Sequence, residues 1–217
     1  ANCPPDNCLE GVKPRAKGTV ITCNQRLTQG ELFPGHKNKL YKTEMLDGIK
    51  VVRVWSWITP NRGTLKRIMD YLSFAVSGFI ASLFHKTDVI IATSPQLFAA
   101  LGGYMASVVK RKPWIMEVRD LWPESIKAVG VMKDDGFAYK FLELFELFIY
   151  RSADRIVMVT YTFKSYISRF NIDSQKISVV KNGVDLQRVK NSPHKNPELS
   201  RQLHLEGKFV VGYIGTH

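Results

Sequence analysis

The sequence predicts an α/β fold in which helices cover a parallel β-sheet on both faces. Short runs of β-branched residues recur along the chain and end at turn residues. Several runs are almost continuously apolar, as strands of a sheet covered on both faces must be. Segments with helical spacing of apolar residues lie between these runs, and such alternation of strand and helix is typical of a doubly wound sheet.

The predicted strands differ in polarity. The runs 88–93, 114–118 and 155–160 are nearly continuous in apolar residues, which fits strands buried on both faces. The run 49–55 alternates apolar and polar residues and is therefore expected to be an edge or half-exposed strand. The remaining strands are expected at 18–23, 177–180 and 209–214.

Helices are expected between these strands. The segment 64–85 carries apolar residues at helical spacing. Ser94 and Pro95 are typical of a helix start, because serine caps the first turn and proline there has no N–H to lose. The other helices are expected at 136–152, with Phe137, Phe141, Leu144 and Phe148 along one stripe, and at 161–170.

The composition is strongly basic, with a net charge of +12 and a pI near 9.7. Such a surface attracts nucleic acid, anionic membranes and phosphorylated substrates alike. No nucleic-acid-binding motif is present, so nucleic acid is not expected as a partner. The longest apolar run, 72–84, is too short for a bilayer span of roughly 20 residues.

The cysteines and glycines predict neither a metal site nor a cofactor. Cys3, Cys8 and Cys23 form no Cys-x-x-Cys pair, and no histidines lie at ligand spacing. We expect reduced thiols in the cytosol, with a Cys3–Cys8 disulfide as the alternative. No Gly-x-Gly-x-x-Gly follows a strand, which argues against a nucleotide-dependent oxidoreductase. The first residues also lack the apolar core of a signal peptide.

The segment 117–126 is the most informative in the chain. Glu117 lies near the end of the apolar run 114–118, and Arg119, Asp120 and Trp122 come soon after that run. Ligands of open α/β sheets bind beyond the carboxyl ends of the strands. Two acids, an arginine and a tryptophan at such a position are poorly explained as core, so the sequence predicts a ligand site there.

Together with other short motifs, this segment resembles family 4 glycosyltransferases of the surface-polysaccharide type, including fucosamine transferases. The resemblance covers about Gly18 to Gly215, and the order and spacing of the motifs carry it. The further matching segments are 33–35, 47–55, 60–61, 71–74, 92–97, 128–130 and 180–185.

The resemblance implies a two-domain GT-B enzyme. Residues 1–180 correspond to the amino-terminal, acceptor-side Rossmann-like domain, and 181–217 to the interdomain crossover and the start of the donor-binding domain. The family's first strand has no counterpart before Gly18, and the donor-binding domain stops at His217. The implied domain is thus truncated at both ends, and we expect this chain to be inactive alone.

The activity implied is a hexosyl-type transfer from a nucleotide-sugar to a polyprenyl-diphosphate-linked or saccharide acceptor. Such transfers build O-antigen, capsule and other cell-surface polysaccharides, including lipopolysaccharide. The resemblance implies chemistry that needs neither a metal nor a cofactor beyond the donor substrate. The alternative is a non-catalytic fragment or degenerate copy that only binds lipid or a partner.

Roles for individual residues follow from this resemblance. Arg119 is expected to pair with the donor phosphate and Asp120 to orient or deprotonate the acceptor hydroxyl. The alternative is that the two side chains pair with each other or cap the next helix. Acceptor contacts are expected from Glu117, Trp122, Ser94 and Gln96, although core packing of Trp122 and plain capping by Ser94 are equally favoured.

Two further segments have expected roles. Asn182 and Gly183 are expected to form a turn with positive φ at the interdomain hinge. The segment 62–86 has basic residues around an apolar centre, which suits a helix lying on anionic lipids. The protein would then be cytoplasmic, with peripheral contact at the inner face of the cytoplasmic membrane. The alternative is a core helix with charged ends that covers the sheet.

Overall fold

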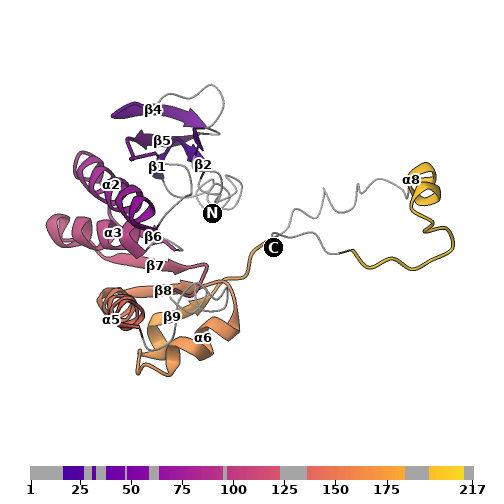
Figure 1. Ribbon diagram of the computed structural model, residues 1–217. Coiled ribbons are helices and arrows are strands. Elements are labelled where there is room, and N and C mark those ends of the chain that lie inside the picture. Colours follow the sequence, from indigo (N-terminus) through magenta and orange to yellow (C-terminus); the bar gives the residue numbers. More distant parts are fainter. Residues whose placement is uncertain are drawn as a thin grey trace. The chain divides into compact units, whose positions relative to one another are not determined.

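The computed structural model describes residues 17–26, 31–32, 38–46, 48–58, 64–94, 97–122, 136–183 and 196–212. The chain divides into two compact units, Ala1–Asn182 and Gly183–His217 (Figure 1). The strands of the first unit are β1 (Thr19–Cys23), β2 (Gln25–Arg26), β3 (Glu31–Leu32), β4 (Tyr41–Leu46), β5 (Ile49–Val54), β6 (Ile90–Thr93), β7 (Trp114–Val118), β8 (Arg155–Met158) and β9 (Ile177–Val179). Its helices are α2 (Thr64–Leu83), α3 (Leu97–Lys110), α5 (Phe137–Ser152), α6 (Tyr161–Ser168) and a 3-10 turn at Ser174–Lys176.

A parallel four-stranded sheet with the order β6-β7-β8-β9 is the centre of the first unit. Because the strand order follows the chain order, each crossover moves in the same direction across the sheet. Right-handed crossovers then place α3, α5 and α6 on the same face. The predicted α/β class, with a Rossmann-like parallel sheet flanked by helices, is confirmed.

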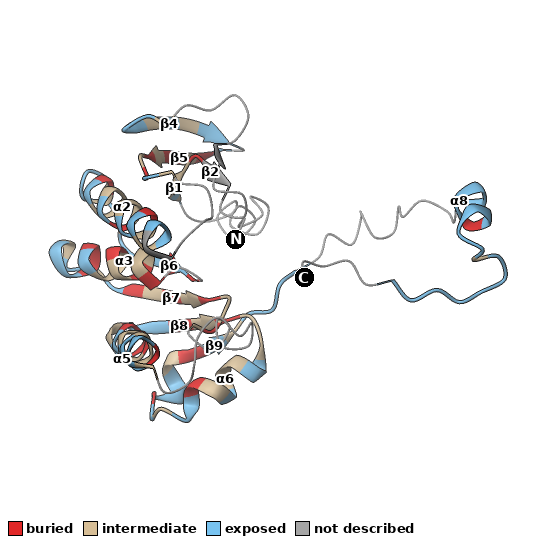
Figure 2. Ribbon diagram, in the orientation of Figure 1, coloured by how far each residue is buried: buried red, intermediate tan, exposed pale blue. Residues whose placement is uncertain are grey.

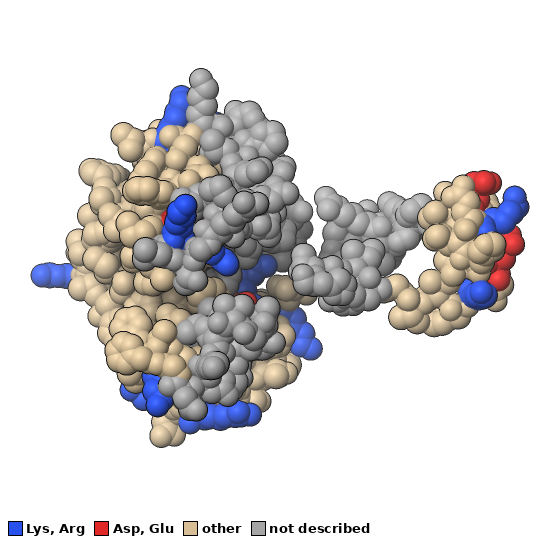
Figure 3. Space-filling view, viewed as in Figure 1, with Lys and Arg blue, Asp and Glu red and all other residues tan. Residues whose placement is uncertain are grey.

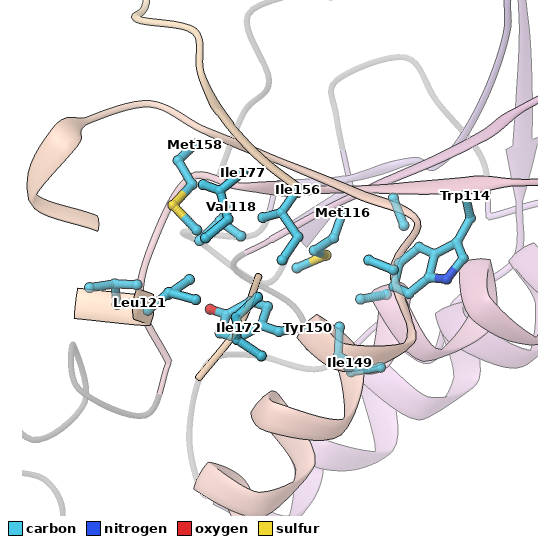
Figure 4. Packing of buried hydrophobic residues seen from close by; sticks show 14 residues of the cluster. Trp114, Met116, Val118, Leu121, Ile149, Tyr150, Ile156, Met158, Ile172 and Ile177 are labelled. Carbon is cyan, nitrogen blue, oxygen red and sulfur yellow. The ribbon is translucent and has the colours of Figure 1, made fainter. Parts of the chain in front are cut away.

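The main core lies between this sheet and its helices. Alternate residues of β7, Trp114, Met116 and Val118, are buried there, with Ile156 and Met158 of β8 beside them (Figure 4). The side chains on the opposite face of the sheet are less covered. They are half-buried or exposed at Ile91, Ile115, Glu117 and Val157.

A second sheet has the order β1-β5-β4, so the predicted edge position of β5 is wrong. β1 pairs with β5 in parallel and β4 pairs with it antiparallel. Glu44 of β4 accepts hydrogen bonds from Lys42 on its own strand and from Arg53 of β5. Arg53, one of the two basic residues that suggested exposure of β5, therefore takes part in an ion-pair network across two strands. β2 and β3 form a separate antiparallel pair.

The helices α2, α3 and α5 lie side by side, with α3 in the middle (Figure 1). α2 and α3 meet at two small residues: a Cβ placed on Gly102 would lie 2.9 Å from the carbonyl oxygen of Ala75. α3 and α5 meet through aromatic rings, with centroids 5.8 Å apart for Phe98–Phe145 and 5.2 Å for Tyr104–Phe148. Close backbone contact and ring packing join the three helices into one layer.

In the second unit the structure describes one helix, α8 (Pro197–Gln202). The Asn196 side chain caps it by accepting a hydrogen bond from the Leu199 N–H, and Pro197 opens its first turn. The strand predicted at 209–214 is not formed by residues 209–212, and 213–214 lie outside the described residues. Phe209 and Val211 are 95% and 85% exposed, so neither contributes to a buried sheet.

The structure divides the chain after Asn182, whereas the domain boundary at 180/181 is a prediction from the sequence. That the second unit begins a donor-binding domain stays a prediction. Across the described residues, every helix is too short or too polar to cross a membrane.

Candidate functional site

The hydroxyl of Ser94, just beyond β6, holds the loop that follows β7. Its Oγ accepts hydrogen bonds from the backbone N–H groups of Arg119 at 2.8 Å and Asp120 at 3.2 Å. The Ser94 N–H in turn donates to the Glu117 carbonyl at 2.8 Å. Ser94 is only 3% exposed, and α3 begins at Leu97. The sequence predicted that this hydroxyl caps a helix or contacts the acceptor. In the structure it positions the loop through its hydrogen bonds.

The loop combines buried and half-buried residues. Val118 and Leu121 are buried in the main core. Arg119, Asp120 and Trp122 are half-buried. The core thus anchors the loop through its apolar members and leaves Arg119, Asp120 and Trp122 half-buried at the carboxyl end of β7.

Glu117 lies one residue before the end of β7, on the less covered face of the sheet. The strand register places it between Thr93 of β6 and Val157 of β8. Its side chain is half-buried and belongs to the same sheet edge as the loop. Such an edge is where open α/β sheets bind their ligands.

The side chains of Tyr150 and Glu146 form a buried phenol–carboxylate pair near this loop. The Tyr150 hydroxyl donates to Glu146 Oε1 at 2.5 Å, and both residues are at most 1% exposed. Burial raises the pKa of Tyr150 well above its usual range, and the negative charges of Glu146 and Asp120 raise it further. Figure 4 shows the Tyr150 oxygen pointing toward Leu121, which follows Asp120.

Sequence reasoning did not single out this pair. The available signal was Glu146 within the mostly apolar helix 136–152, four residues before Tyr150. That spacing places the two side chains on one helix face. An acid there is normally assigned to solvent, so its burial was not predicted.

The predicted hinge lies at the same edge of the sheet as the loop, beyond β9. The Val180 N–H donates to the Met158 carbonyl at 2.8 Å, which extends the pairing of β8 and β9 by one residue. Asn182 and Gly183 are exposed, and neither has a positive φ, so the predicted left-handed turn is wrong. The hinge role itself stays a prediction. Gln96 lies outside the described residues.

Two hollows occur elsewhere on the described surface. One of about 390 Å³ is lined by α5 residues, including Leu144, Phe148 and Arg151. The other, of about 490 Å³, lies between α2 and the segment after β5, with Trp55 and Trp57 in its wall. The described part of the loop, 119–122, lines neither hollow.

The fold and the polar loop place this domain among the open α/β proteins that bind ligands at the carboxyl ends of their parallel strands. Over residues 17–183 the chain matches the family described as "Glycosyl transferase 4-like domain", and it belongs to that family. It is therefore a glycosyltransferase domain of the Rossmann-like GT-B type.

The chain is also similar to "Probable glycosyltransferase WbjE" of Pseudomonas aeruginosa. The two are 25% identical over 147 residues, which is 67% of this chain and 36% of that protein. The chain thus spans little more than a third of the length of this relative.

Proposed function

We propose that this domain takes part in transferring a hexosyl-type sugar, such as fucosamine, from a nucleotide-sugar to a polyprenyl-diphosphate-linked or saccharide acceptor. The product would be a cell-surface polysaccharide such as O-antigen or capsule. Membership of the glycosyltransferase family supports the reaction class. The loop 119–122, anchored by Ser94 at the carboxyl end of β7, is the observation that carries the proposal.

The side chains of the loop suit the charges of a glycosyl transfer. As the sugar–phosphate bond breaks, negative charge develops on the leaving phosphate, and a guanidinium at Arg119 stabilises it through paired hydrogen bonds. The Asp120 carboxylate orients the acceptor hydroxyl or accepts its proton. Glu117 and Trp122 contact the acceptor, with Gln96 as a further contact. The proposal includes no metal and no cofactor apart from the donor substrate.

Substitution of the two charged loop residues tests this assignment. Asp120→Asn and Arg119→Ala should each lower nucleotide-sugar turnover by the full-length protein by about 10²–10⁴-fold, the usual effect of removing such groups. Matched controls are Asp88→Asn and Arg155→Ala, since both residues lie near the amino ends of strands. The controls should keep turnover within about twofold, because exposed substitutions far from a site have small effects.

The outcome separates the two interpretations of the sequence. If both loop variants kept the turnover of the wild-type protein, the assigned roles would be contradicted. A full-length protein that binds a lipid-linked acceptor and turns over no sugar-nucleotide would support the non-catalytic alternative.

We also propose that the protein is cytoplasmic and contacts the inner face of the cytoplasmic membrane, where a polyprenyl-linked acceptor is held. The two faces of α2 support both interpretations of the segment 62–86. Phe74 and Ala81 pack on the core of the second sheet, as expected for a core helix. Leu72 and Val76 are 36% and 56% exposed, as expected for an interfacial helix.

A further inference from the structure

The layer formed by α2, α3 and α5 is unusual in the polarity of its outer surface. Surface helices of soluble domains normally point charged and polar side chains outward. In this layer the exposed positions for which the structure gives side chains are apolar or basic (Figure 2). A surface of this composition needs an explanation beyond the packing of the domain.

The helix α5 shows the inversion most clearly. Its predicted stripe faces outward, with Phe137 88%, Phe141 56%, Leu144 66% and Phe148 44% exposed. Its buried face instead carries Glu146 together with two tyrosines and an isoleucine. The helix thus buries an acid and presents phenylalanine to the outside.

The neighbouring helices extend the same surface. Met69, Val76 and Ile80 of α2 are 45%, 56% and 49% exposed, and Val108 and Val109 of α3 are 57% and 61% exposed. α3 contacts both α2 and α5, so the apolar residues of the three helices belong to one continuous layer. We call this surface the three-helix face.

The groove of about 490 Å³ belongs to this face and is apolar throughout. The hydroxyls of its two serines are engaged by backbone: Ser73 Oγ accepts from the Trp57 N–H at 2.7 Å, and Ser77 Oγ donates to the Trp55 carbonyl at 2.6 Å. The groove therefore offers hydrocarbon and indole surface and suits an apolar chain rather than a polar ligand.

The charges on the three-helix face have one sign. Its exposed charged residues are Lys66, Lys140 and Arg151, whereas Arg67 lies on the opposite side of α2 from Val76. The acids of these helices for which the structure gives exposure are Asp70, Glu143 and Glu146, and none of them is exposed. Figure 3 shows the first unit from the side, with lysine and arginine side chains (blue) spread over its described surface and little acid (red) in view.

Helix α6 of the same unit provides an internal comparison. Its exposed residues are Tyr161, Thr162, Ser165 and Ser168, all of which carry a hydroxyl. The outward apolar character is therefore specific to one side of the domain and is not a property of all its helices.

We propose that the three-helix face docks on an anionic lipid bilayer. Phenylalanine and aliphatic side chains enter the boundary between headgroups and acyl chains, while lysine and arginine at the rim pair with anionic headgroups. A second copy of the chain fits less well, because apposed copies would bring together faces of the same positive sign. This inference rests on the membrane contact proposed above and names the face that makes it. Vesicle binding requires no sugar transfer, so its test is separate from the test of the reaction.

Vesicle sedimentation tests the proposal directly. The wild-type protein should bind vesicles of phosphatidylcholine with phosphatidylglycerol much more tightly than vesicles of phosphatidylcholine alone. The double variant Lys140→Glu/Arg151→Glu should bind the anionic vesicles roughly tenfold more weakly or worse. The control double variant Arg155→Glu/Arg169→Glu changes the net charge equally, at exposed residues outside the face, and should bind like the wild type.

A second measurement avoids any risk of misfolding. Trp57 is 51% exposed in the groove wall, whereas Trp114 is buried. Vesicles containing brominated lipid should quench part of the tryptophan fluorescence of the wild-type protein. Because Trp55 lines the same groove, Trp57→Phe should lose part of that quenching and the double variant Trp55→Phe/Trp57→Phe most of it.

Three results would overturn the proposal. The first is equal binding to neutral and anionic vesicles, and the second is an equal loss in the control double variant. The third is a dimer in light scattering that Phe141→Asp dissociates, which would assign the face to a second copy of the chain. Vesicle binding without turnover on any acceptor would leave this proposal intact and reject only the proposed reaction.

Discussion

At the scale of single residues, the Ser94 hydroxyl has the clearest measurable role. Ser94→Ala removes the acceptor of two backbone N–H groups, and should lower the free energy of unfolding by about 1–3 kcal/mol. Urea unfolding measures this change. Ser168→Ala is the matched control, because its exposed hydroxyl bonds only within α6 and its loss should change stability by no more than about 0.5 kcal/mol. Equal effects of the two substitutions would refute the positioning role.

The Tyr150 hydroxyl predicts a dependence of stability on pH. Its raised pKa keeps Tyr150 protonated in the folded protein at a pH where the unfolded chain loses this proton. The stability contributed by this group is therefore complete below about pH 10, the pKa in an unfolded chain, and falls as the pH rises further.

Tyr150→Phe isolates this contribution. Urea midpoints of the wild-type protein and the variant should differ by a constant amount below about pH 9, and the difference should narrow toward pH 11. At neutral pH the variant should be less stable by about 1–3 kcal/mol, because Glu146 loses a buried donor. A difference that stays constant up to pH 11 would show that Tyr150 ionises normally in the folded protein.

The sequence was informative about which residues gather at the candidate site and less so about what each does there. Arg119, Asp120 and Trp122 lie at the carboxyl end of β7, because a polar run that follows a buried strand directly must begin at that edge of the sheet. The bonding of Ser94 depends on the register that pairs Thr93 with Glu117. A register between distant segments leaves no local signal.

At the scale of elements, the crossing of α2 and α3 depends on the absence of a side chain. Gly102→Ala should lower the free energy of unfolding by about 1–2 kcal/mol, since the new Cβ would lie 2.9 Å from the Ala75 carbonyl oxygen and alanine's better helix propensity offsets only part of that cost.

A glycine of the same layer provides the control. A Cβ on Gly78 would meet Ile21 at an ordinary 3.9 Å. Gly78→Ala should therefore be neutral or stabilising by up to about 1 kcal/mol. Thermal unfolding of both variants measures the contrast, and a Gly102→Ala protein as stable as Gly78→Ala would show that the helices separate at little cost.

Periodicity predicted most elements and missed two kinds of information. It did not reveal β4, because Lys42 and Glu44 give that strand the polarity of a loop. It identified the stripe of α5 without giving its direction. A helix with phenylalanine on one face and Tyr139, Ile149 and Tyr150 on the other is apolar nearly all round, so periodicity alone cannot say which face is inside.

At the scale of the whole molecule, the fold class followed from the regular alternation of strands and helices. The local sequence pattern predicts each βα unit, and right-handed crossovers leave few ways to assemble such units. The division of the central strands into two sheets was not predicted, since strand order depends on contacts between distant segments. The strand predicted at 209–214 followed the same local rule and was wrong for 209–212, where the side chains found no buried surface.

The close approach of Gly102 to the Ala75 backbone has a mechanical consequence. Where two helices touch backbone to backbone, no flexible side chain separates them, and the ring contacts between α3 and α5 continue the same stiffness. The three helices would then move as one rigid layer with one preferred tilt against any flat boundary. The distance of residues 119–122 from that boundary would therefore be set by the fold.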